Sequence, residues 1–323
     1  MTTSKLMILA LMLFTVTANA QQKNDASAFS VRLVRSSDDV NFNIASDLSG
    51  TQTPNVMSEL LWTDMEIWSL EASIRLGLGK HFKFAGDVSY GTVYDGLATN
   101  NGYFGDYRTG LESQSVAQVN GKDLLKAMLG IGWQLEKEFA VPLWKLADEK
   151  RMAFSSHIKF TPIIGFSTTQ HQLKFTDGIQ VVPDLGPFPG LSSSFDTEWE
   201  GFFGGFEGSF RIGGKFYVTA SGYYWPDTSY ASDGNWNLRT DLNQPLSFVQ
   251  EAEGDAFEYE VGLELAIGKN KSIGLSYFNS DFSTGPGTHT YFDLDGNKAF
   301  TRLNGAAWES SGYTLSLTWK FGN

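Results

Sequence analysis

Three glutamates at even spacing, Glu258, Glu260 and Glu264, are residues of this sequence that could do chemistry. An extended strand puts residues separated by even numbers on one face, so the three carboxylates would form a ladder. Such a ladder could conduct ions or take part in catalysis. The interpretation that the sequence favours is a row of carboxylates neutralised by Arg and Lys side chains on neighbouring strands.

A second acidic segment is Asp293-Leu294-Asp295-Gly296-Asn297. It has oxygen ligands at alternate positions, as calcium loops do, but it lacks the later ligands of such a loop. Asp, Gly and Asn are also the usual turn-forming residues. We therefore predict a turn here, and we expect neither a metal nor another cofactor in this protein.

The segment that carries the ladder alternates between polar and apolar residues with a period of two. Its apolar residues are Phe257, Tyr259, Val261, Leu263, Leu265 and Ile267. The end of the chain repeats the pattern, with Thr314, Ser316, Thr318 and Lys320 opposite Tyr313, Leu315, Leu317, Trp319 and Phe321. A face that carries carboxylates cannot point into lipid. The alternation predicts an all-β, transmembrane antiparallel up-and-down β-barrel with a polar lumen.

About ten such strands are expected, near 27–36, 55–78, 82–94, 115–137, 152–175, 196–212, 215–230, 255–268, 272–284 and 306–321. An even number is usual for closed bacterial barrels. Tight turns near 79–80, 213–214 and 268–270 alternate with long polar links near 95–114, 176–195, 231–254 and 285–305. We expect the short turns in the periplasm and the long links outside the cell.

The polar faces of these strands predict a lumen lined by charges of both signs that pair across it. The expected lining residues are Glu71, Arg75, Lys83, Asp87, Glu207, Arg211, Glu258, Glu260, Glu264 and Lys320. A small barrel filled by its own side chains is a wall, because open channels appear only at around 16 strands. General porin activity is therefore not expected.

The beginning of the chain has the features of a cleavable secretory signal. Lys5 supplies the positive charge, Leu6 to Val16 is almost continuously apolar, and Ala18-Asn19-Ala20 is a small-residue cleavage site. We predict a signal peptide over 1–20 and an outer-membrane β-barrel domain over 21–323. The signal, the long strands and the aromatic last strand favour this barrel of a Gram-negative cell envelope over a soluble lipocalin-like or sandwich fold.

Charge and cysteine content narrow the range of partners and stabilising devices. The net charge of -12 argues against nucleic acid. The chain has no cysteine, so disulfides cannot stabilise it and closure of the sheet must do so. The expected partners are outer-membrane lipid, lipopolysaccharide included, and a peptide or surface ligand at the extracellular loops.

Two local stretches carry a resemblance to a known family. They are Val56-Met57-Ser58-Glu59-Leu60-Leu61-Trp62 and the strand pair from Trp199 to Asn235 with its tight glycine turn. In order and spacing they resemble the omptins, ten-stranded outer-membrane proteases with a groove at the extracellular strand ends. The resemblance covers nearly the whole mature chain and implies an omptin-like barrel.

For this family the resemblance implies two acidic residues on the second loop and an Asp-His pair on the fourth, which together activate a water against a peptide bond. In 101–108 only Asp106 is acidic, and Arg108 stands where the second carboxylate would fall. Asp233 matches the aspartate of the pair, whereas Asn235 replaces the histidine. An amide cannot accept a proton near neutral pH, so the family's general base is missing.

Histidines elsewhere offer little replacement for that base. His81 is expected at a short turn and His157 within the lumen, whereas His171 and His289 are expected near the outside. The catalytic candidates are therefore Asp106 and Asp233, and the groove candidates are Arg108, Asn235 and His171.

These residues favour an omptin-like outer-membrane barrel that is not a working protease. Its extracellular loops would bind a ligand or surface partner, or the barrel would have a structural role in the envelope. One alternative is an aspartic-type endopeptidase with a rearranged active site around Asp106 and Asp233. A second alternative is a small-solute pore.

Overall fold

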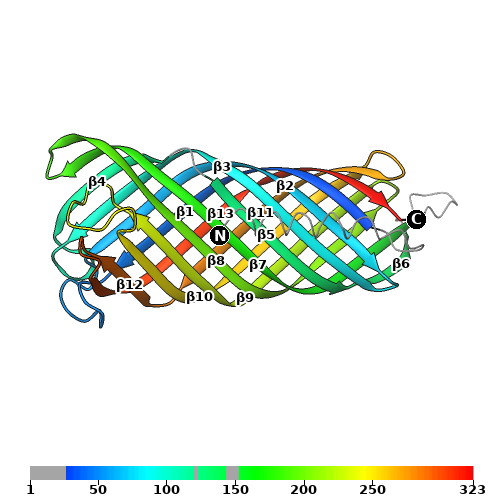
Figure 1. The fold of residues 1–323 in the computed structure, drawn as a ribbon. Helices are drawn as coiled ribbons and strands as arrows, with labels where there is room; N and C mark the ends of the chain where they lie inside the picture. Colours follow the sequence, from blue (N-terminus) through cyan, green and yellow to red (C-terminus); the bar gives the residue numbers. More distant parts are fainter. Residues whose placement is uncertain (1–26, 120–122, 143–152, 323) are drawn as a thin grey trace.

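The computed structural model describes residues 27–119, 123–142 and 153–322, and the predicted signal peptide over 1–20 lies outside them. The described residues form one antiparallel sheet of thirteen strands. The sheet closes because β1 (Ser27–Ile44) pairs with β2 (Ser58–Leu78) on one side and with β13 (Lys298–Phe321) on the other. Figure 1 shows the resulting barrel, which confirms the predicted all-β fold.

The thirteen strands of the described chain occupy about ten positions around the barrel, and we call each position a stave. Two staves are broken, in that each consists of successive shorter strands. One broken stave lies between β3 (Phe82–Tyr103) and β7 (Ala153–Val182); it consists of β4 (Leu111–Val119), β5 (Asp123–Trp133) and β6 (Leu135–Pro142). The other lies between β10 (Phe248–Ala266) and β13; it consists of β11 (Lys271–Thr284) and β12 (Gly287–Phe292). The remaining staves are β8 (Gly186–Ile212) and β9 (Phe216–Asn235).

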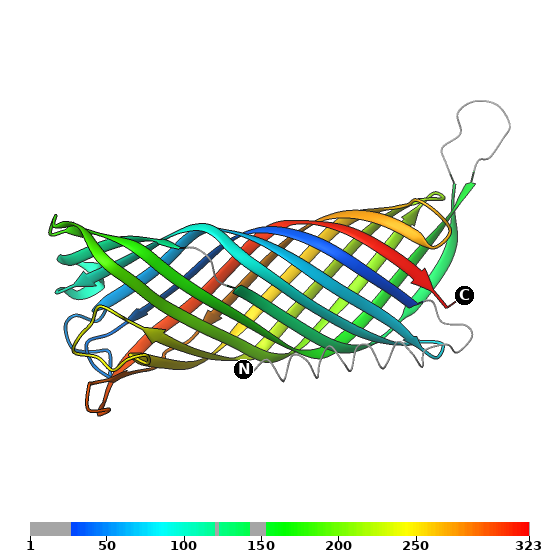
Figure 2. The ribbon, with the colours of Figure 1, turned by 45° about the horizontal axis from the view of Figure 1, so that its top comes forward.

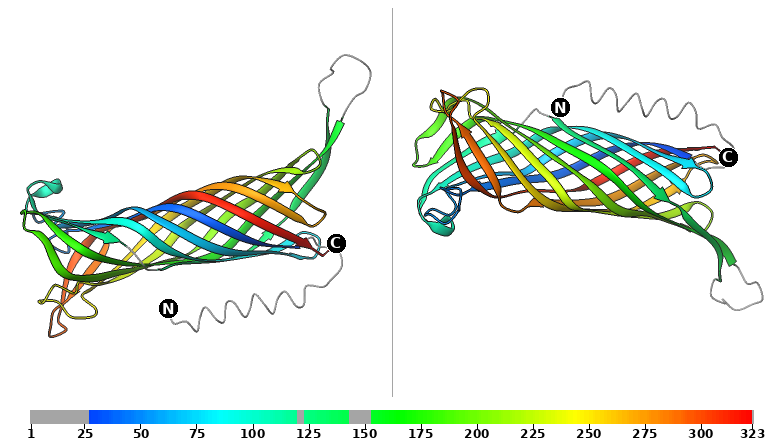
Figure 3. Two further views of the ribbon diagram at one scale, coloured as in Figure 1. Left: turned by 90° about the horizontal axis from the view of Figure 1, so that it is seen from above. Right: turned by 60° about the horizontal axis from the view of Figure 1, so that its bottom comes forward.

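The barrel has two different ends, which we call the turn end and the loop end. The turn end holds the short connections 79–81, 213–215 and 267–270, together with the last residues of β13. The loop end holds the connections 45–57, 104–110, 183–185, 236–247 and 293–297. Figure 2 shows the strongly tilted strands that run between the two ends. Figure 3 shows that β6 and β7 continue past their neighbours at the turn end.

The long polar links predicted from the sequence are wrong in extent, because the strands continue into them. β3 runs to Tyr103, β9 runs to Asn235, and β7 and β8 are joined by residues 183–185 alone. Beyond the membrane the outer face meets water, where both polar and apolar residues are tolerated. The alternation of apolar and polar residues therefore ends there, although the strands remain hydrogen-bonded to their neighbours. The barrel is therefore longer than the sequence pattern indicated.

The outer face marks where the lipid-facing band ends on the loop side. Tyr259, Tyr277 and Tyr313 lie side by side on β10, β11 and β13, with ring centroids 6.5 and 5.5 Å apart. Nearer the loop end, Asp281 is paired in register with Glu309, and Glu309 with Asp39 of β1. Aromatic residues at the edge of an apolar band are typical of membrane barrels, and the adjacent carboxylates belong in water.

At this boundary the polarity of the strands is inverted. In β1, Val31 and Leu33 point outward and Arg32 points into the barrel, whereas further along Phe42 points inward and Asp39 points outward. In β1 the inward-facing positions are even-numbered on both sides of the boundary, so the change is in residue type and not in the direction in which the positions point. Toward the turn end the barrel is thus apolar outside and charged inside, and toward the loop end it is polar outside and apolar inside.

No helix within the described ranges is long and apolar enough to cross a bilayer.

Candidate functional site

The loop-end half of the interior is filled by large aromatic side chains, which we call the aromatic plug. Each of them is at most 3% exposed. They come from seven staves that surround the interior, and they are Phe42, Trp62, Phe195, Trp199, Trp225, Phe248, Phe282 and Trp308.

The rings of the plug contact one another across the barrel. Phe195 of β8 is stacked on Trp62 of β2 with a centroid distance of 4.6 Å and an interplanar angle of 13°, and it lies 5.1 Å from Phe42. Phe282 of β11 lies 5.4 Å from Trp225 and 4.7 Å from Trp308. Contacts of this kind are those of a close-packed protein interior. This half of the lumen is built as a hydrophobic core.

His171, a groove candidate, lies inside this core. It is 1% exposed, and its ring lies 4.6 Å from that of Trp308. Its Nε2 is 3.9 Å from Asp38 Oδ2, and its Nδ1 is 3.3 Å from the Thr197 hydroxyl. Trp308 and Ser310 donate to the Asp38 carboxylate at 2.8 and 2.7 Å. His171 thus lies in the loop-end half of the interior, where inward-facing apolar neighbours bury its ring.

His289 of β12 is buried in the same way. Its ring lies 4.7 Å from Phe248 and 4.3 Å from Tyr291, and its Nδ1 is 3.0 Å from the Gln250 amide nitrogen. Burial lowers the pKa of His289 to about 3. The imidazole is therefore neutral at pH 7, and its pKa is too low for a general base at that pH.

Asp106 lies in the short 3₁₀ turn Asp106–Arg108 between β3 and β4. One carboxylate oxygen accepts a hydrogen bond from the Thr53 hydroxyl at 2.9 Å, and the other accepts one from the Asn55 N–H at 2.8 Å. Arg108 donates two hydrogen bonds to Glu59 at 2.6 and 2.8 Å. Both side chains thus join this turn to the β1–β2 connection and to β2.

Asp233 is exposed on the outer side of β9, since the neighbouring Ser232 and Gly234 face the interior. Asn235 is half-buried and is paired in register with Ser194. β4, β7 and β8 lie between β9 and the strand that leads to Asp106. The structure therefore places Asp106 in a loop contact, Asp233 on an outer wall and His171 inside the core, and it does not assemble them around one substrate site.

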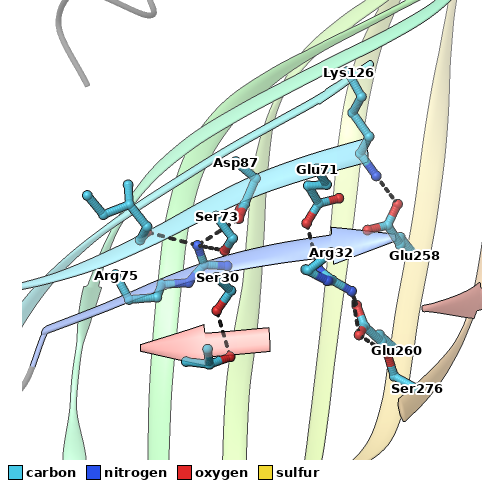
Figure 4. A network of polar contacts seen from close by, with 12 residues as sticks. Ser30, Arg32, Glu71, Ser73, Arg75, Asp87, Lys126, Glu258, Glu260 and Ser276 are labelled. Atoms are coloured by element: carbon cyan, nitrogen blue, oxygen red, sulfur yellow. Dashed lines mark hydrogen bonds and ion pairs between the residues drawn. The ribbon is translucent and has the colours of Figure 1, made fainter. Parts of the chain in front are cut away.

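The turn-end half of the interior is a charged chamber around a cavity of about 380 Å³. Figure 4 shows that Arg32 of β1 bridges two carboxylates, Glu71 at 2.7 Å and Glu260 at 2.6 Å. The charged residues that line this chamber are Arg32, Glu71, Arg75, Lys83, Asp87, Lys126, Lys159, Glu207, Glu258, Glu260, Glu264 and Lys320.

The other charges of the chamber are also arranged as opposite pairs. Arg75 lies 2.8 Å from both Asp87 and Glu207, and Tyr223 donates to Glu207 at 3.0 Å. In the glutamate ladder, Glu258 binds Lys126, Glu260 binds Arg32, and Glu264 binds Lys320 at 2.8 Å. Nearer the turn end, Arg211 is 3.7 Å from Glu138, and His157 is 3.5 Å from Glu136. These contacts give the ladder the chemistry of a neutralised wall.

Sequence reasoning missed four members of this chamber: Arg32, Lys126, Lys159 and Tyr223. Arg32 alternates with Val31 and Leu33, so extending the period-two test to β1 would have found it. Lys126 has apolar residues on both sides in sequence, and no alternation marks it as inward-facing. The Asp293 segment forms the predicted turn, with its carboxylate accepting from the backbone N–H groups of Asp295 and Asn297 at 2.9 and 2.8 Å.

Comparison with known proteins supports an outer-membrane barrel. The family model described as Protochlamydia outer membrane protein matches residues 35–321. No curated protein matches the sequence.

Among solved structures, the outer membrane protease OmpT from Escherichia coli is similar in fold. Its TM-score is 0.69 at 13% identity, over 92% of this chain and 97% of that chain. The translocator domain of the autotransporter NalP from Neisseria meningitidis has a TM-score of 0.34 at 10% identity, with coverage of 98% and 96%. A FadL homologue from Pseudomonas aeruginosa has a TM-score of 0.30 at 11% identity, with coverage of 91% and 90%. At 13% identity, the likeness to OmpT is one of fold alone.

Proposed function

The chain belongs to the Protochlamydia outer membrane protein family, and from this premise we propose that it is a closed, non-proteolytic barrel whose loop end binds a partner outside the cell. Short turns of such barrels face the periplasm and their longer connections face outward. The loop-end half, with its polar outer wall, then stands in water beyond the lipid. The aromatic plug carries the proposal, because it fills the space through which a solute or a substrate would pass.

The positions of the catalytic candidates support the absence of proteolysis. Peptide hydrolysis needs a base within hydrogen-bond reach of a water, and that water within reach of the substrate carbonyl. Asp106 is engaged by the β1–β2 connection, and His171 is shielded by Trp308. Neither residue offers an accessible base beside Asp233.

The experiment that tests this proposal combines conductance with cleavage. The mature chain, refolded in detergent, would be inserted in planar bilayers and separately incubated with peptides that contain basic cleavage sites, with and without lipopolysaccharide. We expect bilayers without conductance steps and peptides that remain intact. Steady single-channel steps would establish a pore, and cleavage that disappears in an Asp106→Ala, Asp233→Ala variant would establish a protease; either result would overturn the proposal.

Binding at the loop end is measured with the same refolded protein in nanodiscs. Peptide and glycan arrays would be probed with the native chain and with a variant whose 45–57 and 236–247 connections are replaced by tight turns. Circular dichroism would verify that the variant is folded. Binding by the native chain alone is expected, and equal binding by both proteins would contradict a role for the loop end.

A further inference from the structure

The β3–β4 connection, Phe104–Gly110, has an unusual backbone. Tyr107 and Arg108, two successive residues with side chains, adopt left-handed conformations with φ of 55° and 61°. Such conformations are unfavourable for residues that have a Cβ. They persist where surrounding contacts over-determine them, commonly at functional sites. A plain turn would place glycine at these two positions, so the side chains themselves require an explanation.

Contacts to the neighbouring connection hold this turn in place. The Asp106 carboxylate accepts from the Thr53 hydroxyl at 2.9 Å and from the Asn55 N–H at 2.8 Å. Asn55 in turn accepts from the Tyr107 N–H through its Oδ1 at 2.8 Å, and Arg108 binds Glu59 at 2.6 Å. Each residue of Asp106–Arg108 is therefore tied to the β1–β2 connection or to β2. We call the whole connection, Phe104–Gly110, the braced turn.

The braced turn projects two aromatic rings into solvent. Tyr107 is 82% exposed and Phe104 is 65% exposed, although the backbone that carries them is fixed. Tyrosine in a rigid position contributes large contact area at a low cost in conformational entropy. Exposed aromatics on a braced backbone have the properties of anchor residues for another surface.

The charge of the loop end indicates which kind of partner surface would bind there. Its connecting segments contain two basic residues, Arg108 and Arg239, which are paired with Glu59 and Asp241 at 2.6 Å each. The other carboxylates in these segments, apart from the paired Asp241, are Asp47, Asp106, Asp184, Asp293 and Asp295. Their uncompensated charge attracts a basic partner and repels an acidic one.

We infer that the braced turn is the anchor through which the loop end docks a basic polypeptide surface, with Tyr107 and Phe104 entering an apolar pocket and Lys or Arg side chains meeting the rim carboxylates. This inference rests on the proposed function, which it makes specific. Aromatic rings also stack on sugars, but a neutral or acidic glycan gains nothing from the carboxylates. A polypeptide uses both features.

The probe is a phage-displayed random peptide library, panned on the full barrel in nanodiscs and counter-selected on empty nanodiscs. Enrichment of peptides that combine Lys or Arg with apolar residues is expected. A synthetic copy of an enriched peptide should bind the Phe104→Ala, Tyr107→Ala variant at least about tenfold more weakly. Added salt should weaken its binding to the native chain.

Leu294→Ala provides the matched control, because Leu294 is an exposed apolar residue on a different connection of the same end. Its affinity for the peptide should equal that of the native chain. An equal loss in both variants, enrichment of acidic or uncharged peptides, or no enrichment at all would overturn the inference. If glycans bind the loop end while no peptide does, this inference fails and the proposed function stands; if neither binds, both fail.

A second variant tests the bracing without removing any ring. Asn55→Ala deletes the Asn55 Oδ1 acceptor of the Tyr107 N–H and leaves Phe104 and Tyr107 in place. Because the loosened turn must be ordered on binding, peptide affinity should fall by about threefold to tenfold. Unchanged affinity would show that the rings act without a preformed turn and would contradict their role as a fixed anchor.

Discussion

The loop-end half of the barrel is packed with aromatic rings, whereas the turn-end half holds ion pairs around a cavity. The difference follows from what lies outside each half. Where lipid covers the wall, apolar residues such as Leu263 and Leu315 are used outside, and polar residues remain for the interior. Where water covers the wall, the polar residues are used outside, and burial of apolar residues stabilises the interior. The same strands thus pass from lipid to water, and the side of the sheet that carries their apolar residues changes from the outer to the inner face.

The two halves should also differ in how they respond to loss of a side chain. The plug is stabilised by burial and packing, so any removed ring leaves a cavity. The chamber is stabilised by matching of charges. Removing one charged residue of an ion-paired cluster should therefore lower the free energy of unfolding more than removing all the charges of that cluster. The predictions below test this distinction, beginning with the largest effect.

Trp62→Ala should be the most damaging of these substitutions, because Trp62 is fully buried against Phe195 and Phe42. A loss of about 3–5 kcal/mol in the free energy of unfolding is expected, from lost burial and from the cavity that remains. Urea-induced unfolding in detergent or lipid vesicles would measure it. Trp68→Ala on the same strand is the control: Trp68 faces outward and is 41% exposed. A comparable loss in both variants would contradict a core in the loop-end half.

Arg75→Met should destabilise the chamber by about 3 kcal/mol, because it leaves Asp87 and Glu207 without their shared cation. The triple variant Arg75→Met, Asp87→Asn, Glu207→Gln removes the whole charged group and should regain most of this loss. Urea unfolding of the three proteins makes the measurement. If the triple variant were less stable than Arg75→Met alone, the carboxylates would be stabilising in themselves and matching of charge would not describe the chamber.

The sequence predicted best the half that faces lipid. There the alternation of Phe257 to Ile267 and of the last strand marks both faces, and the structure has the strands with those faces. In the loop-end half, much of the sequence predicted as links is strand; β7 and β8, for example, continue through most of 176–195. The prediction failed there because these residues face no lipid and so lack the lipid-facing alternation. A test for period two that assumes apolar residues outside does not recognise Phe42 or Trp62, which are apolar and face inward.

The candidate site was less accessible to prediction, since its contacts join residues far apart in sequence. Asp106 meets the Asn55 N–H across a separation of 51 residues, and Asp38 meets Trp308 across 270. Neither contact has a local pattern. The sequence did indicate that Asn235 cannot replace a histidine base, because that statement depends on side-chain chemistry alone.

The smallest change in the free energy of unfolding is expected when an exposed Arg–Asp pair is broken, a pair of the same chemistry as Arg75 and Asp87. Arg239 lies 2.6 Å from Asp241 in the β9–β10 connection, and its hydrogen bonds lower the pKa of Asp241 to about 2. A carboxyl whose pKa is lowered on folding stabilises above its unfolded pKa, near 3.8, and that contribution is lost as the pH falls toward 2. Because solvent screens the pair, Asp241→Asn should cost less than about 1 kcal/mol at pH 7 and nothing near pH 2. Urea unfolding at both pH values measures this, and a loss at pH 7 as large as that of Arg75→Met would show that burial does not set the strength of these pairs.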